Sequence, residues 1–341
     1  MKKTIGCVKI YKIMITKIEP ITTESLKLAS ELIKNGEVVA FPTETVYGLG
    51  VSAYDKEGVK KVFLAKGRPS DNPLIVHIAD VGDLNQVALE ITDNAKKLLN
   101  AFAPGPITVV LKKREEIVDE VTAGLDTVGV RIPSHKGARD FIKACGLPIA
   151  APSANTSQRP SPTTALAVYD DMQGKIPLIL DGGNCDVGIE SSVIDCRFET
   201  PVILRAGKIT GEDVKRVCGS VKYATEKSEI RSPGMKYRHY APKCQMFVRF
   251  LTLDNLQERI ENLQKANKTV LLLGNSKAKE LKADKFIYLG ESVEEYMQSY
   301  FSSLREGEEQ ADVMICYIPF KEKEAEGLYN RALKSSGGEE I

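Results

Sequence analysis

The chain has 341 residues and 43% hydrophobic composition, which is well above that of a disordered chain and enough for two packed cores. Lysine and arginine number 47 against 46 for aspartate and glutamate, so the net charge of +1 supplies no global field that would attract nucleic acid or an anionic membrane. Seven cysteines stand far apart without a C-x-x-C pair, which indicates reduced thiols. The N-terminus lacks a signal-peptide core and no apolar run of roughly 18 residues occurs, so we expect a soluble, cytoplasmic protein without membrane contact.

The first part of the chain predicts an α/β domain with one large mixed sheet. Apolar residues at helical spacing follow Thr22, and Asn35 and Gly36 end this helix before a buried strand at 38–41. Further strands are predicted at 73–77, 107–111, 128–132, 148–151, 177–180, 192–195 and 202–204, with helical patterns between most of them. Thr210 and Asp213 are typical of a capping box that opens a short helix.

The remainder predicts a linker and a smaller Rossmann-like α/β domain. Apolar periodicity is lost from residue 224 to 230, so we expect the first domain at 1–221, with its core at about 22–210, a linker at 222–243 and a second domain at 244–341. Strands are predicted at 246–250, 270–273, 286–289 and 313–318, and apolar residues from Val293 to Leu304 recur at helical spacing.

Two polar segments follow predicted strands of the first domain. Residues 41–50, FPTETVYGLG, run from a buried strand into hydroxyls and glycines, which suits either a ligand site or a turn capped by threonine hydroxyls. Lys66 and Arg68, two residues apart, would share one face of an extended segment and could bind phosphates together. A solvated basic turn is the alternative.

Two further features point to anion binding. Arg131 stands inside an apolar strand, where its guanidinium needs either an internal carboxylate or a substrate carboxylate. Beyond the strand that ends in Ser153 and Asn155, Ser161 and Pro162 predict a helix N-terminus whose free N–H groups would face an anion; a capped helix without a ligand is the alternative. No Walker, G-x-G-x-x-G or H-E-x-x-H motif occurs, so any ATP is held in another way.

Together these segments resemble the YrdC-like family in its long two-domain form, the L-threonylcarbamoyladenylate synthases. The family hallmark, lysine-x-arginine followed far downstream by serine-x-asparagine, corresponds to Lys66, Arg68, Ser153 and Asn155. The segments FPTETVYGLG, DNPLIVH, TAGLDTVGVR, APSAN and PGMKYRHYAP follow in the family order, and GLYNRALKSSG is similar to its closing segment. Family members commonly start near Met14, so the residues before it are an extension or a misassigned start.

The resemblance implies a twisted mixed sheet with flanking helices, a positively lined cavity, and a linker that covers this cavity. It also implies the activity: L-threonine, bicarbonate and ATP give threonylcarbamoyl-AMP and pyrophosphate, for threonylcarbamoyladenosine modification of tRNA. Magnesium would be held through the phosphates, without a protein metal site. The product would pass to a separate tRNA threonylcarbamoyl transferase, with weak or no direct tRNA binding.

The same resemblance assigns roles to individual residues. The catalytic residues are Lys66, Arg68, Ser153 and Asn155. Threonine is contacted by Thr45, His77, Arg131, Ala151 through its backbone, and Ser191. ATP is contacted by Arg68, Asn72, Thr127, Ser153, Ser161, Arg205 and Tyr237. An RNA-binding YrdC-like module without adenylate synthesis is the main alternative, which the neutral net charge disfavours; a carbamoyl transferase is the other, although its zinc-finger and acylphosphatase modules are missing from this sequence.

Overall fold

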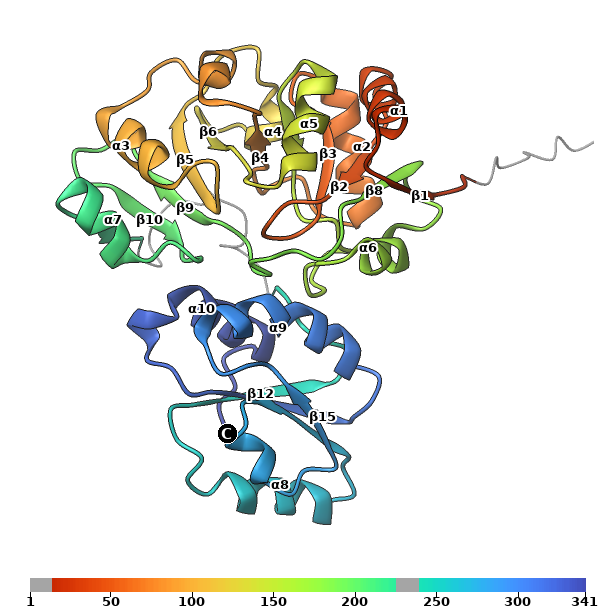
Figure 1. The fold of residues 1–341 in the computed structure, drawn as a ribbon, viewed down its shortest axis with the longest axis vertical. Coiled ribbons are helices and arrows are strands. Elements are labelled where there is room, and N and C mark those ends of the chain that lie inside the picture. The colour runs from red at the N-terminus through yellow and green to blue at the C-terminus, as the bar shows by residue number, and fades with distance from the viewer. Residues whose placement is uncertain (1–13, 225–238) are drawn as a thin grey trace, which may run out of the picture.

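The N-terminal sheet has eleven strands in the computed structural model, which describes residues 14–224 and 239–341 (Figure 1). Its order is β1-β8-β2-β3-β7-β4-β6-β5-β9-β10-β11, with parallel and antiparallel neighbours, so the predicted mixed sheet is confirmed. The strands are β1 (Lys17–Pro20), β2 (Val39–Phe41), β3 (Gly48–Ser52), β4 (Ile75–His77), β5 (Ile107–Lys112), β6 (Thr127–Arg131), β7 (Ile149–Ala151), β8 (Leu178–Asp181), β9 (Ser192–Asp195), β10 (Val202–Arg205) and β11 (Lys222–Tyr223).

Helices cover both faces of this sheet, which explains why its strands are apolar on both sides. The helices are α1 (Thr23–Lys34), α2 (Lys56–Lys66), α3 (Asp93–Phe102), α4 (Asp119–Thr122), α5 (Lys136–Cys145), α6 (Ala165–Met172) and α7 (Gly211–Cys218), with a 3-10 turn at Val81–Gln86. Within β2, Val39 and Phe41 join the core under α1 and α5, whereas Ala40 joins the core under α2, α3 and α6. Because both faces of the sheet are covered by packed helices, the polar ends of its strands are the positions where a ligand could bind.

Local signals fix the helix ends. Thr22 caps α1 at its N-terminus, and Asn35 caps its C-terminus, as the sequence predicts. The capping box of Thr210 and Asp213 opens α7, also as predicted.

The strand β3 is not among the strands predicted from the sequence, and its glycines are rare inside strands. Gly50 is nevertheless required in this strand: a Cβ there would lie 2.9 Å from both Ile149 Cγ2 and the Phe41 ring. The edge strand β1 had no clear pattern, and β11 extends the sheet two residues past the expected domain end at 221. The predicted linker at 222–243 falls mostly outside the described residues.

The C-terminal sheet is fully parallel, in the order β12-β15-β13-β14, and confirms the predicted Rossmann-like form. Its elements are β12 (Gln245–Phe250), α8 (Leu256–Lys265), β13 (Val270–Gly274), β14 (Lys285–Tyr288), α9 (Val293–Gly307), β15 (Val313–Ile318) and α10 (Glu326–Ser336), with 3-10 turns at Ala278–Glu280 and Glu322–Glu324. Figure 1 shows α9 and α10 on the side that faces the N-terminal sheet and α8 on the far side. The helical spacing from Val293 to Leu304 is thus confirmed in α9.

The two sheets are joined by direct packing. Val187 and Ile189 of the N-terminal part belong to the same apolar cluster as α9 and α10. At Gly188, with φ +78°, a Cβ would lie 2.3 Å from the backbone oxygen of Met297, so the chains meet without room for a side chain. Among the described residues, no helix is long and apolar enough to cross a membrane.

Candidate active site

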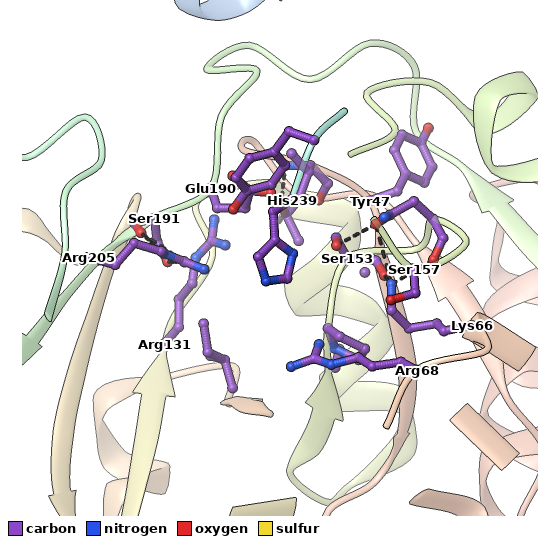
Figure 2. A pocket seen from close by; sticks show the side chains of 18 of the residues that line it. Tyr47, Lys66, Arg68, Arg131, Ser153, Ser157, Glu190, Ser191, Arg205 and His239 are labelled. Carbon is purple, nitrogen blue, oxygen red and sulfur yellow. Dashed lines mark hydrogen bonds between the residues drawn. The ribbon is translucent and has the colours of Figure 1, made fainter. Parts of the chain in front are cut away.

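A cavity of about 710 Å³, a volume that includes its mouth open to solvent, lies at the ends of several strands of the N-terminal sheet. His239 and Tyr240, which precede the first strand of the C-terminal domain, also line it. Figure 2 shows that Arg131 and Arg205 lie on one side of His239, and Lys66 and Arg68 on the other. The described residues that line it are Thr43, Val46, Tyr47, Gly48, Lys66, Arg68, Ile75, His77, Arg131, Ala151, Pro152, Ser153, Asn155, Ser157, Gln158, Glu190, Ser191, Arg205, His239 and Tyr240.

Lys66 and Arg68 both line this cavity, but the predicted extended segment is wrong. Lys66 is the last residue of α2, and Gly67 ends the helix in the left-handed region at φ 61°. The two side chains therefore reach the cavity from a helix end and the turn beyond it. Arg68 Nη2 donates to the backbone oxygen of Asn72 at 3.3 Å.

The Lys66 ammonium anchors the segment from Ser153 to Asn155. Its Nζ donates to the backbone oxygen of Ser153, to that of Asn155 at 2.7 Å, and to Asn155 Oδ1 at 3.3 Å. Burial and the charge of Arg68 lower the pKa of Lys66 well below its usual value. Three acceptor oxygens nevertheless match the three donors of the ammonium form.

Hydrogen bonds within the serine-x-asparagine segment hold its side chains in place. Ser153 Oγ donates to Asn155 Oδ1 at 2.5 Å, and Asn155 Nδ2 donates to the backbone oxygens of Thr156 and Arg159 at 2.8 and 3.0 Å. The hallmark residues thus form one connected cluster with Lys66.

Arg131 and His77 end two neighbouring parallel strands and stand side by side in register. Arg131 Nη1 donates to Thr45 Oγ1 at 2.8 Å, and its Nη2 lies 2.8 Å from Glu44 Oε1. The contact with Glu44 lacks hydrogen-bond geometry, so Arg131 Nε and Nη2 have no hydrogen-bond acceptor among the described residues. An internal carboxylate is present, and donors remain for a second anion.

Both histidines of the cavity wall are held neutral at physiological pH. Burial and the charge of Arg131 lower the pKa of His77 to about 3, and its Nδ1 has no hydrogen-bond partner among the described residues. Burial and the charge of Arg68 lower the pKa of His239 to about 4. Neutral imidazoles can donate or accept hydrogen bonds to a substrate without adding charge.

Ser191 and Arg205 form the wall beside Arg131. Arg205 Nε and Nη2 donate to the backbone oxygen of Ser191 at 3.1 and 2.9 Å, and Ser191 Oγ lies 2.8 Å from Thr108 Oγ1. Burial and the charge of Arg331 lower the pKa of Arg205 to about 10, so it stays cationic. Burial raises the pKa of Glu190, but the charges of Arg331 and Arg205 outweigh this effect and lower it to about 2.

Four of the described residues assigned by resemblance do not line the cavity. Thr45 is fully buried, and its hydroxyl accepts a hydrogen bond from Arg131. Asn72 is buried, and its side-chain amide has no partner within the described parts of the chain. Thr127 stands at the opposite end of β6 from Arg131, about 13 Å along the strand. Tyr237 falls outside the described residues.

Ser161, the fourth, does not cap a helix, so the predicted anion seat is wrong. The helix begins at Ala165 and is capped by Thr164. The Ser161 hydroxyl instead donates to Glu190 Oε1, and the backbone oxygen of Pro162 accepts from Tyr47 N at 2.9 Å. These partners hold the Ser161–Pro162 peptide against neighbouring segments rather than in a helical turn.

Ser157 and Gln158 line the cavity but were not found from the sequence. Gln158 has φ 73°, which no local residue signal indicates, and its backbone oxygen accepts from Ala241 N at 2.9 Å. This contact fixes the segment that carries His239 and Tyr240 against the cavity.

The fold and cavity define a two-domain α/β protein with a cavity lined by the cationic side chains of Lys66, Arg68, Arg131 and Arg205. Comparison with known families gives two matches that together span most of the chain. A Sua5/YciO/YrdC family model, described as telomere recombination, matches residues 31–207. A second model, described as the C-terminal domain of threonylcarbamoyl-AMP synthase, matches residues 209–337. The chain belongs to the Sua5/YciO/YrdC family, in the form that carries this C-terminal domain.

Individual relatives match over nearly the whole chain. The threonylcarbamoyl-AMP synthase of Pyrococcus abyssi is 42% identical over 336 residues, which cover 95% of this chain and 98% of that protein. The threonylcarbamoyl-AMP synthase of Bacillus subtilis is 41% identical and covers 92% of this chain and 93% of its own length. A crystal structure of P. abyssi Sua5 complexed with L-threonine has a TM-score of 0.89 at 40% identity, covering 97% of this chain and 99% of that one.

Proposed function

We propose that this chain is an L-threonylcarbamoyladenylate synthase, which forms threonylcarbamoyl-AMP and pyrophosphate from L-threonine, bicarbonate and ATP. The names of its full-length relatives support this activity. The observation that carries the proposal is the charge of the cavity: Lys66, Arg68, Arg131 and Arg205 line it, and Glu190 is the carboxylate among its described lining residues. Such a wall suits a reaction whose substrates are all anionic or carry a carboxylate.

Threonine is assigned to the Arg131 side of the cavity. Arg131 Nε and Nη2 lack acceptors, and His77 Nδ1 beside them lacks a partner, so the described protein leaves polar atoms available for an amino acid. The threonine carboxylate would accept from the Arg131 guanidinium, with the Ala151 backbone and Ser191 around it. The assignment of Thr45 to threonine rests on the family resemblance alone. The crystallised complex of P. abyssi Sua5 with L-threonine supports the choice of this amino acid.

ATP is assigned to the opposite side, where Lys66 and Arg68 would neutralise phosphate charge. Lys66 donates hydrogen bonds to the backbone oxygens of Ser153 and Asn155, and these two residues would position the phosphates together with it. Arg205 would meet the nucleotide from the wall beside Arg131. The assignments of Asn72, Thr127, Ser161 and Tyr237 to the nucleotide rest on the family resemblance alone.

The proposed mechanism is positioning and charge stabilisation, without a covalent enzyme intermediate. The threonine nitrogen bonds to the bicarbonate carbon, and water leaves as the carbamate forms. A carbamate oxygen then attacks the α-phosphorus, and the bond to the β-phosphate oxygen breaks to release pyrophosphate. Lys66 and Arg68 would stabilise the charge that develops on this leaving group.

Magnesium would enter this site as a part of the bound nucleotide. Residues 14–224 and 239–341 contain no group of three His, Cys, Asp or Glu side chains that could hold a metal ion. Glu190 already pairs with Arg331 and accepts from Ser161, so its oxygens are engaged. The phosphate oxygens would supply the ligands that magnesium prefers.

In the cytoplasm, the product would pass to a separate tRNA threonylcarbamoyl transferase.

An isotope experiment tests the proposed reaction. The protein is incubated with magnesium, ATP, ¹³C-bicarbonate and ¹⁵N-threonine, and the products are followed by NMR and mass spectrometry. We expect one nucleotide product that contains both labels and shows a ¹³C–¹⁵N coupling. AMP without either label would contradict the proposal, and RNA binding without ATP turnover would favour the RNA-binding alternative.

A further inference from the structure

Helix α10 of the C-terminal domain sends one buried arginine into the wall of the N-terminal site. Arg331 is 0% exposed, and its Nε donates to Glu190 Oε2 at 2.8 Å. This ion pair therefore joins the two domains away from water. Removing one partner of such a pair leaves an uncompensated buried charge.

The same guanidinium also holds two stretches of backbone. Arg331 Nη2 donates to the backbone oxygen of Glu190 at 3.1 Å, and Nη1 donates to that of Ala206 at 2.6 Å. Glu190 precedes Ser191 and Ala206 follows Arg205, and Arg205 in turn donates to the backbone oxygen of Ser191. Arg331 thus closes a ring of contacts through two lining residues that Figure 2 shows side by side.

Backbone packing fixes where this arginine lies. A Cβ at Gly207 would lie 2.4 Å from Ser192 N, and a Cβ at Gly327 would lie 2.7 Å from the carbonyl carbon of Gly207. The first turn of α10 therefore rests directly on the segment that follows Arg205. The guanidinium enters the site from a close-packed helix rather than from a flexible side of the domain.

Charge gives this contact a role in the reaction, if the proposed function holds. The Glu190 carboxylate faces a cavity that would receive the phosphates of ATP and the carboxylate of threonine. Without a counter-ion it would repel both. We propose that Arg331 is a positioning residue through which the C-terminal domain completes the active site: it neutralises Glu190 and holds Ser191 and Arg205 in their binding positions.

This role predicts a particular kinetic effect. Ser191 is assigned to threonine and Arg205 to ATP, so loss of Arg331 should raise the KM of both substrates together. A residue that only stabilised the fold would lower the amount of active enzyme, and hence kcat, without changing either KM.

The test compares Arg331→Met with a matched arginine of the same interface. Arg305 on α9 also crosses to the N-terminal part, where it donates to Asp171 Oδ2 at 2.7 Å and to the backbone oxygen of Pro160. Arg305 does not line the cavity. We expect Arg331→Met to raise both KM values by about tenfold or more, and Arg305→Met to change them by less than about twofold.

A second variant isolates the charge. In Arg331→Met with Glu190→Gln, the unpaired carboxylate is gone, so both KM values should return at least about threefold toward the wild-type values. If Arg331→Met does not fold, Arg331→Lys, which keeps the charge without the planar fork, should raise both KM values.

Three results would overturn the inference: unchanged KM values in the Arg331 variants, an equal effect of Arg305→Met, or no recovery in the double variant. If the wild-type protein itself makes no labelled adenylate, it is the proposed function that fails. The two failures are therefore distinguishable in one set of assays.

Discussion

Arg131 Nη2 lies 2.8 Å from Glu44 Oε1 with both side chains buried, yet the pair does not have hydrogen-bond geometry. Glu44 therefore neutralises the charge of Arg131 without accepting a hydrogen bond from its N–H groups. The two explanations that the sequence left open for Arg131, an internal carboxylate and a substrate carboxylate, are compatible in this arrangement. This ion pair orients the guanidinium, and Nε and Nη2 have no hydrogen-bond acceptor among the described residues.

Substitution of this arginine tests the threonine assignment. In Arg131→Lys a bidentate fork becomes a point charge, so we expect the threonine KM to rise by about tenfold or more while the ATP KM changes by less than about twofold. Steady-state kinetics with each substrate varied in turn measures both values. Equal increases for threonine and ATP would rule out a threonine-specific role for Arg131.

Lys66→Met tests the catalytic lysine. Its side chain would no longer hold the Ser153–Asn155 backbone or neutralise phosphate, so kcat should fall about a hundredfold. Lys61 on the same helix is the matched control, because its exposed ammonium pairs with Glu37 at 2.8 Å. Lys61→Met should keep the wild-type rate, and a Lys66→Met enzyme that did the same would exclude a catalytic role.

The buried His77 should make the fold sensitive to acid. Burial and Arg131 lower its pKa from 6.5 to about 3, so between these values the unfolded chain binds a proton that the folded chain does not. The free energy of unfolding should therefore fall with decreasing pH, by up to about 1.4 kcal/mol per pH unit from this histidine. His77→Gln should reduce that slope between about pH 6 and 5, above the range of most carboxylates. Denaturant unfolding at each pH measures it, and equal slopes in both proteins would contradict the shift.

The second domain and the linker should be required for activity. A chain that lacks residues from Ser232 onward should form no adenylate even where circular dichroism shows a folded first domain, because His239, Tyr240 and Arg331 are lost. The full-length variant Gly188→Val should have the same effect, since its side chain would meet the backbone of Met297. Wild-type rates in either protein would show that the N-terminal domain is sufficient.

Much of the fold could be predicted because its signals are local. The spacing of apolar residues predicted α9, and the cap residues Thr22 and Thr210 predicted where α1 and α7 begin. The strand β3 was missed because its glycines serve packing against Phe41, a contact that propensity does not contain. The turn after Lys66 was predictable, since a glycine directly behind a helical pattern is a common C-cap.

The sequence predicted those site residues that belong to recognisable family motifs. The resemblance brought together Lys66, Arg68 and the serine-x-asparagine segment, and the structure places them on one cavity wall. The partnership of Arg331 with Glu190 joins residues 141 positions apart, and no local pattern marks either one as the partner of the other. Tertiary contacts of this kind need the folded arrangement of both domains.

The central claim is tested most directly by pyrophosphate release. Pyrophosphate is measured with ATP and magnesium alone, with threonine or bicarbonate added singly, and with both added together. We predict rapid release only when both are present, because the carbamate that attacks ATP contains atoms of each. Release that is independent of threonine or of bicarbonate would contradict the proposed synthesis of threonylcarbamoyl-AMP.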